Sequence, residues 1–127
     1  MARLFTTIFL CVISMNSYSF EKVFYCAYQI DDCVETPSPI TKVIIEDLLP
    51  IIANGEKNFI GFVDSNDTTF QFYVDDVNKI LVEIPVTKEK GSYSKHINEE
   101  EFYKLISTLK EPFIDYKKNL GLEYVAW

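Results

Sequence analysis

The pattern of hydrophobic and polar positions predicts β-strands in the middle of the chain. Apolar and polar residues alternate along residues 67–86, DTTFQFYVDDVNKILVEIPV, as in strands with one buried face. The residues that this alternation assigns to the core are Phe70, Phe72 and Val74 on one strand and Ile80, Val82 and Ile84 on the next. Together with a strand at residues 58–64, NFIGFVD, and an acidic turn at residues 75–78, the pattern predicts a meander of three antiparallel strands.

Helical periodicity appears on either side of this meander. Apolar residues recur at three- and four-residue steps over residues 40–52, with Ser38 expected as the N-cap and Pro39 in the first helical position. The clearest helix start is Asn98, because Glu101 follows three residues later in the spacing of a capping box. An apolar stripe then continues the second helix.

The remaining segments complete a prediction of the α+β class. Residues 20–30 are aromatic and β-prone, residues 92–97 resemble a short strand, and Pro112 and Gly121 bracket a short last helix. LEYVAW at the end of the chain reads as a strand or an apolar tail. We therefore expect residues 20–127 to form one domain, an antiparallel β-meander sheet with two or three α-helices packed on one face.

The first 19 residues have the order of a secretory signal peptide. Arg3 precedes an apolar run that extends to Met15, and small polar residues end the segment at Ser19. Cleavage there would make Phe20 the mature start and would place the protein in the periplasm or outside the cell. The run is too short for a permanent transmembrane helix, so no stable membrane insertion is expected. The alternative is a buried first strand or helix in a cytoplasmic protein.

The cysteine positions agree with export. Cys11 falls in the segment to be removed, whereas Cys26 and Cys33 remain as a pair that could form a disulfide in an oxidising compartment. The alternative is two reduced cysteines, one on a strand and one in a loop. A zinc site is not expected, since His96 is the only histidine and the cysteine spacing does not match known sites.

The charge argues against a nucleic-acid partner. The 127 residues contain 12 basic and 19 acidic side chains, a net charge of −7, which becomes −8 without Arg3. A phosphate backbone repels such a surface. Solubility alone is the competing explanation for the acidity.

The inventory of reactive groups predicts a protein without an active site. Triad chemistry would have to use His96, and the chain has no nucleophile-elbow glycines. Neighbouring carboxylates occur at residues 31–32, 75–76 and 99–101, where turns and a helix start account for them. Residues 64–67 lack the glycine and distal glutamate of an EF-hand. We therefore predict no catalytic, cofactor-binding or metal-binding residues.

A protein-binding surface is the remaining candidate. Tyr73 and Gln71 lie on the strand face opposite the core residues, beside Glu83 on the neighbouring strand. Aromatic and acidic groups together suit a protein partner, so Tyr73, Asp75, Asp76 and Glu83 are the predicted binding residues. The alternative is that helices cover this face and that the tyrosine packs inside.

The order of elements from residue 58 to residue 109 resembles small immunity proteins of bacterial polymorphic-toxin and contact-dependent inhibition systems. The segments that carry the resemblance are NFIGFVD, TTFQFYV, ILVEIPV, GSYSKHI and NEEEFYKLISTL. The resemblance implies a compact α+β inhibitor that binds and neutralises a cognate toxin. The acidic charge of this chain predicts a basic binding face on that toxin. If the protein is exported, that toxin should act in the periplasm, for example on peptidoglycan or membrane.

Two other functions remain open at this point. One is a small secreted or periplasmic hydrolase that uses carboxylates, which requires a deep cleft holding at least two carboxyl groups. The other is a periplasmic binding module similar to lysozyme inhibitors. The sequence predicts neither the oligomeric state nor the identity of the toxin.

Overall fold

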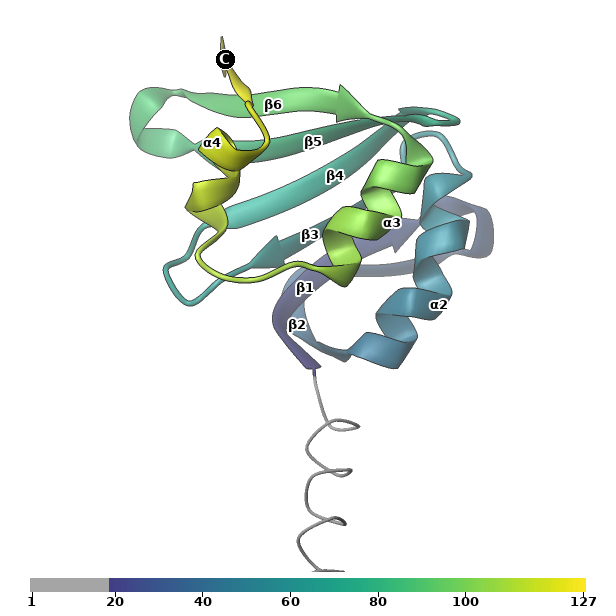
Figure 1. Cartoon of the computed structure of the whole chain (residues 1–127). Coiled ribbons are helices and arrows are strands. Elements are labelled where there is room, and N and C mark those ends of the chain that lie inside the picture. Colours follow the sequence, from purple (N-terminus) through teal and green to yellow (C-terminus); the bar gives the residue numbers. More distant parts are fainter. Residues whose placement is uncertain (1–18) are drawn as a thin grey trace, which may run out of the picture.

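Seven β-strands form one antiparallel sheet in the computed structural model, which describes residues 19–127 and the side chains of residues 22–127 (Figure 1). The strands are β1 (Ser19–Ala27), β2 (Asp32–Thr41), β3 (Phe59–Val63), β4 (Thr69–Asp76), β5 (Lys79–Val86), β6 (Gly91–Ile97) and β7 (Glu123–Ala126). Their order in the sheet is β2-β1-β3-β4-β5-β6-β7. The predicted three-stranded meander is confirmed and continues through β6 and β7. The predicted signal peptide lies outside the described residues, apart from its last position.

Three α-helices cover one face of this sheet (Figure 1). They are α2 (Lys42–Ala53), α3 (Glu99–Ser107) and the single turn α4 (Tyr116–Asn119). Short 3₁₀ turns are η1 (Tyr28–Ile30), η2 (Thr87–Glu89) and η3 (Phe113–Asp115). The α+β prediction with helices on one face is therefore confirmed. Within residues 19–127, no helix is long and apolar enough to cross a membrane.

The core lies between the helices and the inner face of the sheet. Phe72 is fully buried, and its ring makes edge contacts with Phe70 at 5.1 Å and with Phe102 of α3 at 5.2 Å between centroids. The other large, fully buried side chains include Phe62, Ile45, Ile52, Ile60, Ile80 and Ile84. Burial of these aromatic and aliphatic side chains supplies the hydrophobic driving force for folding.

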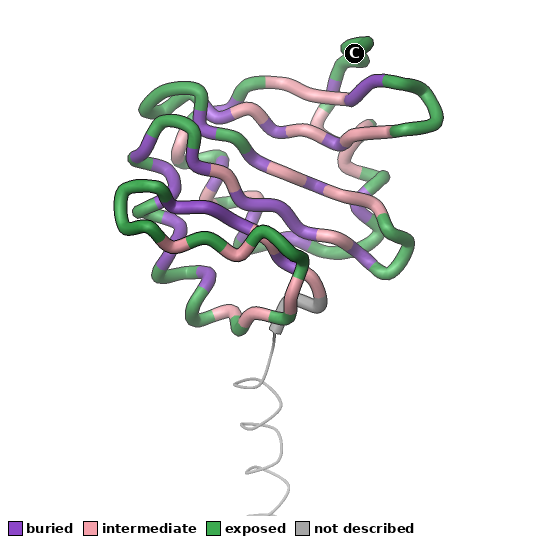
Figure 2. Tube along the Cα trace, turned by 180° about the vertical axis from the view of Figure 1, so that it is seen from behind, coloured by how far each residue is buried: buried purple, intermediate pink, exposed green. Residues whose placement is uncertain are grey.

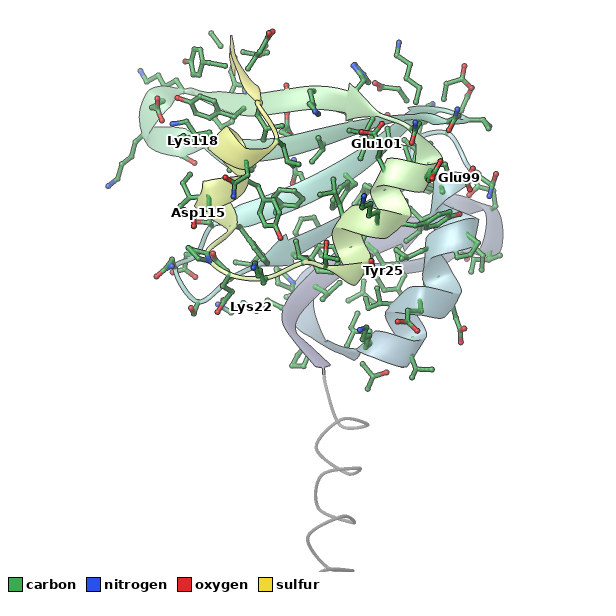
Figure 3. All side chains as sticks on the ribbon, in the orientation of Figure 1. Lys22, Tyr25, Glu99, Glu101, Asp115 and Lys118 are labelled. Atoms are coloured by element: carbon green, nitrogen blue, oxygen red, sulfur yellow. A yellow bond between two sulfur atoms is a disulfide. The ribbon has the colours of Figure 1, made fainter. Side chains whose placement is uncertain are left out.

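The predicted start of α3 is confirmed. Asn98 Oδ1 accepts from the Glu101 N–H at 2.8 Å, and Glu101 Oε1 accepts from the Asn98 N–H at 3.2 Å. The side chain of Asn78, in the β4–β5 turn, also accepts from the Glu99 N–H at 2.8 Å. Figure 3 shows Glu99 and Glu101 at this end of α3. Three N-terminal N–H groups are therefore satisfied, one of them by the hairpin.

The predicted start of α2 is wrong. Ser38 and Pro39 lie in β2, and the helix begins at Lys42 with Thr41 as its N-cap. The Ser38 hydroxyl donates to the Thr36 carbonyl instead. Pairing of β2 with β1 continues as far as Thr41, so strand pairing overrides the local capping signal.

The predicted β4–β5 turn is shorter than expected. Asp75 and Asp76 belong to β4, and the turn consists of Val77 and Asn78. Asn78 has φ 62°, in the left-handed region that asparagine tolerates better than most residues. The pairing of β4 with β5 is irregular between Val74 and Asp76 and ends with Asp76 opposite Lys79, so both carboxylates are presented from a strand end.

Two buried polar side chains hold loops to the core. The amide of Asn58 accepts from the Tyr28 N–H at 3.0 Å and donates to the carbonyls of Ile51 and Ile52 at 3.3 Å. Asp64 Oδ2 accepts from the Phe113 N–H at 2.8 Å, and its Oδ1 accepts from N–H groups in the β3–β4 loop. These bonds join segments that are distant in the sequence, so the loops around the sheet are fixed.

The two edges of the sheet differ. Edge strand β2 contains Pro37 and Pro39, which have no backbone N–H, and its pairing with β1 has two register shifts. Edge strand β7 contains no proline, and every one of its residues is exposed. Prolines and irregularities are ordinary protections against strand addition, so only the β2 edge is protected in this way.

Candidate functional site

The face of the sheet opposite the helices is uncovered (Figure 2). Buried and partly exposed residues alternate along β3, β4 and β5, as expected when only one face packs on a core. We call the uncovered surface the open face. Its residues include Phe24, Phe59, Gln71, Tyr73, Asp75, Leu81, Glu83, Ser92, Ser94, His96 and Glu123. The alternative that helices bury Tyr73 is not what the structure shows, since its side chain is 38% exposed.

An aromatic row crosses the open face. The strand register places Phe59 opposite Tyr73, Tyr73 opposite Leu81, and Leu81 opposite His96. Phe24 lies beside this row, with its ring 6.2 Å from the Phe59 ring between centroids. Directly opposed side chains on a sheet are close enough to contact, so Phe59, Tyr73 and Leu81 form one continuous apolar strip that ends at His96.

Glu83 lies next to the aromatic row and is held by two hydrogen bonds. Gln71 Nε2 donates to Glu83 Oε1 at 2.6 Å, and Ser92 Oγ donates to Glu83 Oε2 at 2.9 Å. The three residues come from β4, β5 and β6. Both donors are neutral, so the carboxylate is oriented without a cation neutralising it.

Asp75 is also on the open face, where its Oδ2 lies 2.5 Å from Nε2 of His96. His96 is exposed near the end of β6. The Asp76 carboxylate instead accepts from the Val77 N–H at 2.7 Å, in the turn. The structure therefore brings Tyr73, Asp75 and Glu83 onto one face and places Asp76 at its border.

The two cysteines lie in line with the aromatic row, because register places Cys26 opposite Phe59. Cys26 of β1 and Cys33 of β2 are directly opposed, with a Cα–Cα distance of 4.1 Å, and are joined by a disulfide. Both are therefore on strands, and the reading with one cysteine in a loop does not describe the structure. The disulfide ties the edge strand β2 to the rest of the sheet.

Sequence reasoning missed Phe24, Phe59, Ser92 and His96 as parts of this surface. Each occupies an outward position on its strand, so the alternation of side chains along the strand is the signal that could have placed it on this surface. The pattern could assign Phe59 and Phe24 to outward positions only once the register between their strands was known. Pairing across β1, β3 and β4 is a tertiary property, which local alternation does not specify.

Two hollows lie elsewhere on the described surface. One, of about 600 Å³, is lined by Ile114, Asp115, Lys117, Lys118, Asn119 and Leu122. The other, of about 30 Å³, lies between α2 and α3 and is lined by Lys42, Ile45, Glu46, Leu49, Ile106 and Ser107. Each contains a single carboxylate, so neither has the two carboxyl groups that the hydrolase alternative requires.

Two tyrosines have strongly raised pKa values, but both lie away from the open face. Burial, together with a hydrogen bond to Asp32 at 2.9 Å, raises the pKa of Tyr25 to about 12. Burial and a hydrogen bond to Glu99 at 2.5 Å likewise raise the pKa of Tyr103 to about 12. Tyr25 belongs to the helix-covered side of the sheet and Tyr103 to α3, so neither contributes to the open face.

Comparisons of the chain with protein-family models, with curated proteins and with solved structures found no match. The class of the fold is therefore established from the structure itself, and any function has to be argued from the chemistry of the open face.

Proposed function

We propose that this protein is a non-enzymatic immunity protein that binds and neutralises a cognate bacterial toxin through the open face. The observation that carries the proposal is an uncovered sheet face with an aromatic row beside carboxylates. The order of strands and helix that resembles immunity proteins supports it as well.

The chemistry of the open face suits a protein partner. Tyrosine is enriched among residues that dominate binding energy, because its large ring loses little conformational entropy when it is fixed. Tyr73 is half-exposed near the centre of the sheet, flanked by partly buried Phe59 and Leu81. The carboxylates of Asp75 and Glu83 flank this apolar strip, so a basic partner would meet complementary charge around an apolar centre.

The size of the face is also adequate. Seven strands at about 4.8 Å spacing make a sheet about 29 Å wide, and the eight residues of β4 extend about 27 Å. A stable protein–protein interface needs about 800 Å² on each partner. A face of roughly this area is available without any rearrangement of the helices.

The experiment is co-expression with the product of the neighbouring gene, followed by a growth assay and a pull-down. We expect that product to arrest growth alone, and this protein to restore growth and to form a stable complex with it. A harmless neighbouring product, or a toxic one that this protein neither binds nor counteracts, would contradict the proposal.

Two alanine variants locate the surface. Tyr73→Ala should weaken the complex by about 2 kcal/mol or more, about thirtyfold in Kd, mainly through faster dissociation. Tyr124→Ala is the matched control, because Tyr124 is 46% exposed and packs on Tyr93 on the helix-covered side of the sheet. Equal losses in the two variants would show that the open face is not the binding surface.

A further inference from the structure

Each carboxylate oxygen of Glu83 can accept a further hydrogen bond. An ionised carboxylate has about four lone-pair sites, two on each oxygen. Gln71 occupies one site on Oε1 and Ser92 occupies one on Oε2. One acceptor site is therefore left on each oxygen, which is the requirement for a bidentate pair with a planar cation.

The orientation of this carboxylate is already fixed. Its two donors come from strands on either side of β5, and register pairs Gln71 with Glu83 directly. A flexible surface glutamate loses rotamer entropy when it is immobilised by a partner. Because Glu83 is held before binding, much of this cost is already met within the folded protein.

An aromatic ring lies next to the carboxylate. Tyr73 is opposite Leu81, two residues along β5 from Glu83, so Tyr73 and Glu83 are diagonal neighbours on the open face. Diagonal neighbours on an antiparallel pair are about 7–8 Å apart, a separation that long and aromatic side chains bridge. A cation paired with Glu83 therefore comes within reach of the Tyr73 ring.

The charge around this position is negative. Among the described residues of β4 to β7, the open face carries the carboxylates Asp75, Glu83 and Glu123. His96 is hydrogen-bonded to Asp75, and Lys79 lies at the turn end of β5, four residues from Glu83. Register places Ser94 between Glu83 and Glu123, so acceptors follow one another across three strands.

We propose that the open face binds an arginine side chain of the protein partner, with the guanidinium paired to Glu83 and lying against the ring of Tyr73. A guanidinium is planar, donates two parallel N–H bonds to a carboxylate and stacks on aromatic rings. A lysine ammonium is a compact and strongly hydrated point charge, which fits neither the paired acceptor sites nor the ring face as well. This inference rests on the proposed function, since it assigns the chemistry of the partner at the same face.

The test uses two dipeptide probes of equal charge, acetyl-Arg-Arg-amide and acetyl-Lys-Lys-amide, titrated into the ¹⁵N-labelled protein. Amide chemical shifts around Tyr73, Glu83 and Ser94 should respond to the arginine probe with a Kd at least threefold below that of the lysine probe. Equal Kd values for the two probes, or shift changes centred on the acidic start of α3, would overturn the inference.

Variants separate a specific site from general acidity. Glu83→Gln, which keeps the shape of the side chain, should weaken binding of the arginine probe at least fivefold. Tyr73→Ala leaves the carboxylate in place and should weaken it at least threefold. The control is Glu100→Gln, an exposed carboxylate of α3 on the helix side, which should leave the Kd unchanged. Unchanged binding in Glu83→Gln, or an equal loss in Glu100→Gln, would overturn the inference.

The outcomes distinguish this inference from the proposed function. A protein that neutralises the toxin but shows no preference for the arginine probe would disprove the arginine site alone. A protein that prefers the arginine probe but gives no protection in the growth assay would disprove the immunity function alone.

Discussion

Gly61 of β3 determines how the aromatic side chains of the open face are arranged. A Cβ built on Gly61 would lie 2.1 Å from Cζ of Phe24, so the Phe24 ring rests across the position that a side chain would occupy. The ring also packs against Phe59. The absence of a side chain at residue 61 therefore allows one aromatic ring to cover the backbone of a neighbouring strand.

The substitution Gly61→Ala should destabilise the protein by about 1–2 kcal/mol, because the Phe24 ring has to move away from its position. In a Phe24→Ala background the clash is absent, so the same substitution should then cost less than about 0.5 kcal/mol. Urea denaturation of the single and double variants measures the coupling. Additive losses would contradict this account of Gly61.

The two tyrosines with raised pKa values make stability depend on alkaline pH. Their pKa of about 12 in the folded protein exceeds the usual value of 10.0 because the neutral hydroxyl is favoured by burial and by a carboxylate acceptor. The stability that Tyr25 and Tyr103 contribute is therefore fully present below pH 10 and is lost as the pH rises towards 12.

An ultraviolet titration of phenolate absorption should show two tyrosines that ionise near pH 12. Tyr25→Phe and Tyr103→Phe should each remove one of these late steps and reduce the loss of stability between pH 10 and pH 12. Two late steps in either single variant, or any late step in the double variant, would assign them to other residues.

Asn78 connects two elements, the β4–β5 hairpin and α3. Its backbone adopts the left-handed conformation that the turn requires, and its side chain accepts from the Glu99 N–H. The substitution Asn78→Gly keeps the backbone conformation but removes the acceptor, and it should cost about 1 kcal/mol. Asn78→Ala adds strain at positive φ and should cost about 1 kcal/mol more.

Denaturation of both Asn78 variants, with Asn98→Ala as the reference for loss of the N-cap of α3, measures these contributions. Asn98→Ala should cost about 1 kcal/mol. If Asn78→Gly is as stable as the unsubstituted protein, the hairpin contributes nothing to the helix start.

The disulfide stabilises the pairing of β1 with β2, and its two cysteines are seven residues apart in the sequence. Closing so short a loop should contribute about 2–3 kcal/mol by restricting the unfolded chain. The double variant Cys26→Ala and Cys33→Ala should therefore lower stability by about this amount.

A thiol reagent applied under denaturing, non-reducing conditions to protein from an oxidising compartment should label neither cysteine. Labelling of both would show that the bond does not form there.

The elements that could be predicted from the sequence are those with a complete local signal. Asn98 and Glu101 alone form the capping box of α3. The alternation along β4 and β5 likewise shows which of their side chains share a face of the sheet. The start of α2 could not be predicted, because Ser38 and Pro39 have a local preference for a helix start that pairing with β1 overrides. The open face shows the same limit, since alternation places Tyr73 and Glu83 together but does not determine which face the helices cover.

For the whole molecule, the acidic charge should govern how fast a basic partner associates. Asp75→Lys with Asp76→Lys should slow association by about tenfold at low salt and weaken its salt dependence. Glu46→Lys with Asp47→Lys, on the exposed side of α2, changes the net charge equally but lies on the other face. Screening over about 8 Å at physiological ionic strength should keep this control close to the unsubstituted rate. Rapid-mixing kinetics of the unsubstituted protein and the two double variants measures the difference, and equal slowing would mean that net charge alone steers association.

The contrast between the two sheet edges limits how copies of the protein can assemble. Each molecule has one edge that can pair with another strand, because β7 is free to do so whereas the prolines of β2 oppose strand addition at the other edge. Linear growth requires two reactive ends on each unit. Edge-to-edge association through β7 therefore stops at a pair, and concentrated solutions should contain monomers and pairs rather than a ladder of longer oligomers.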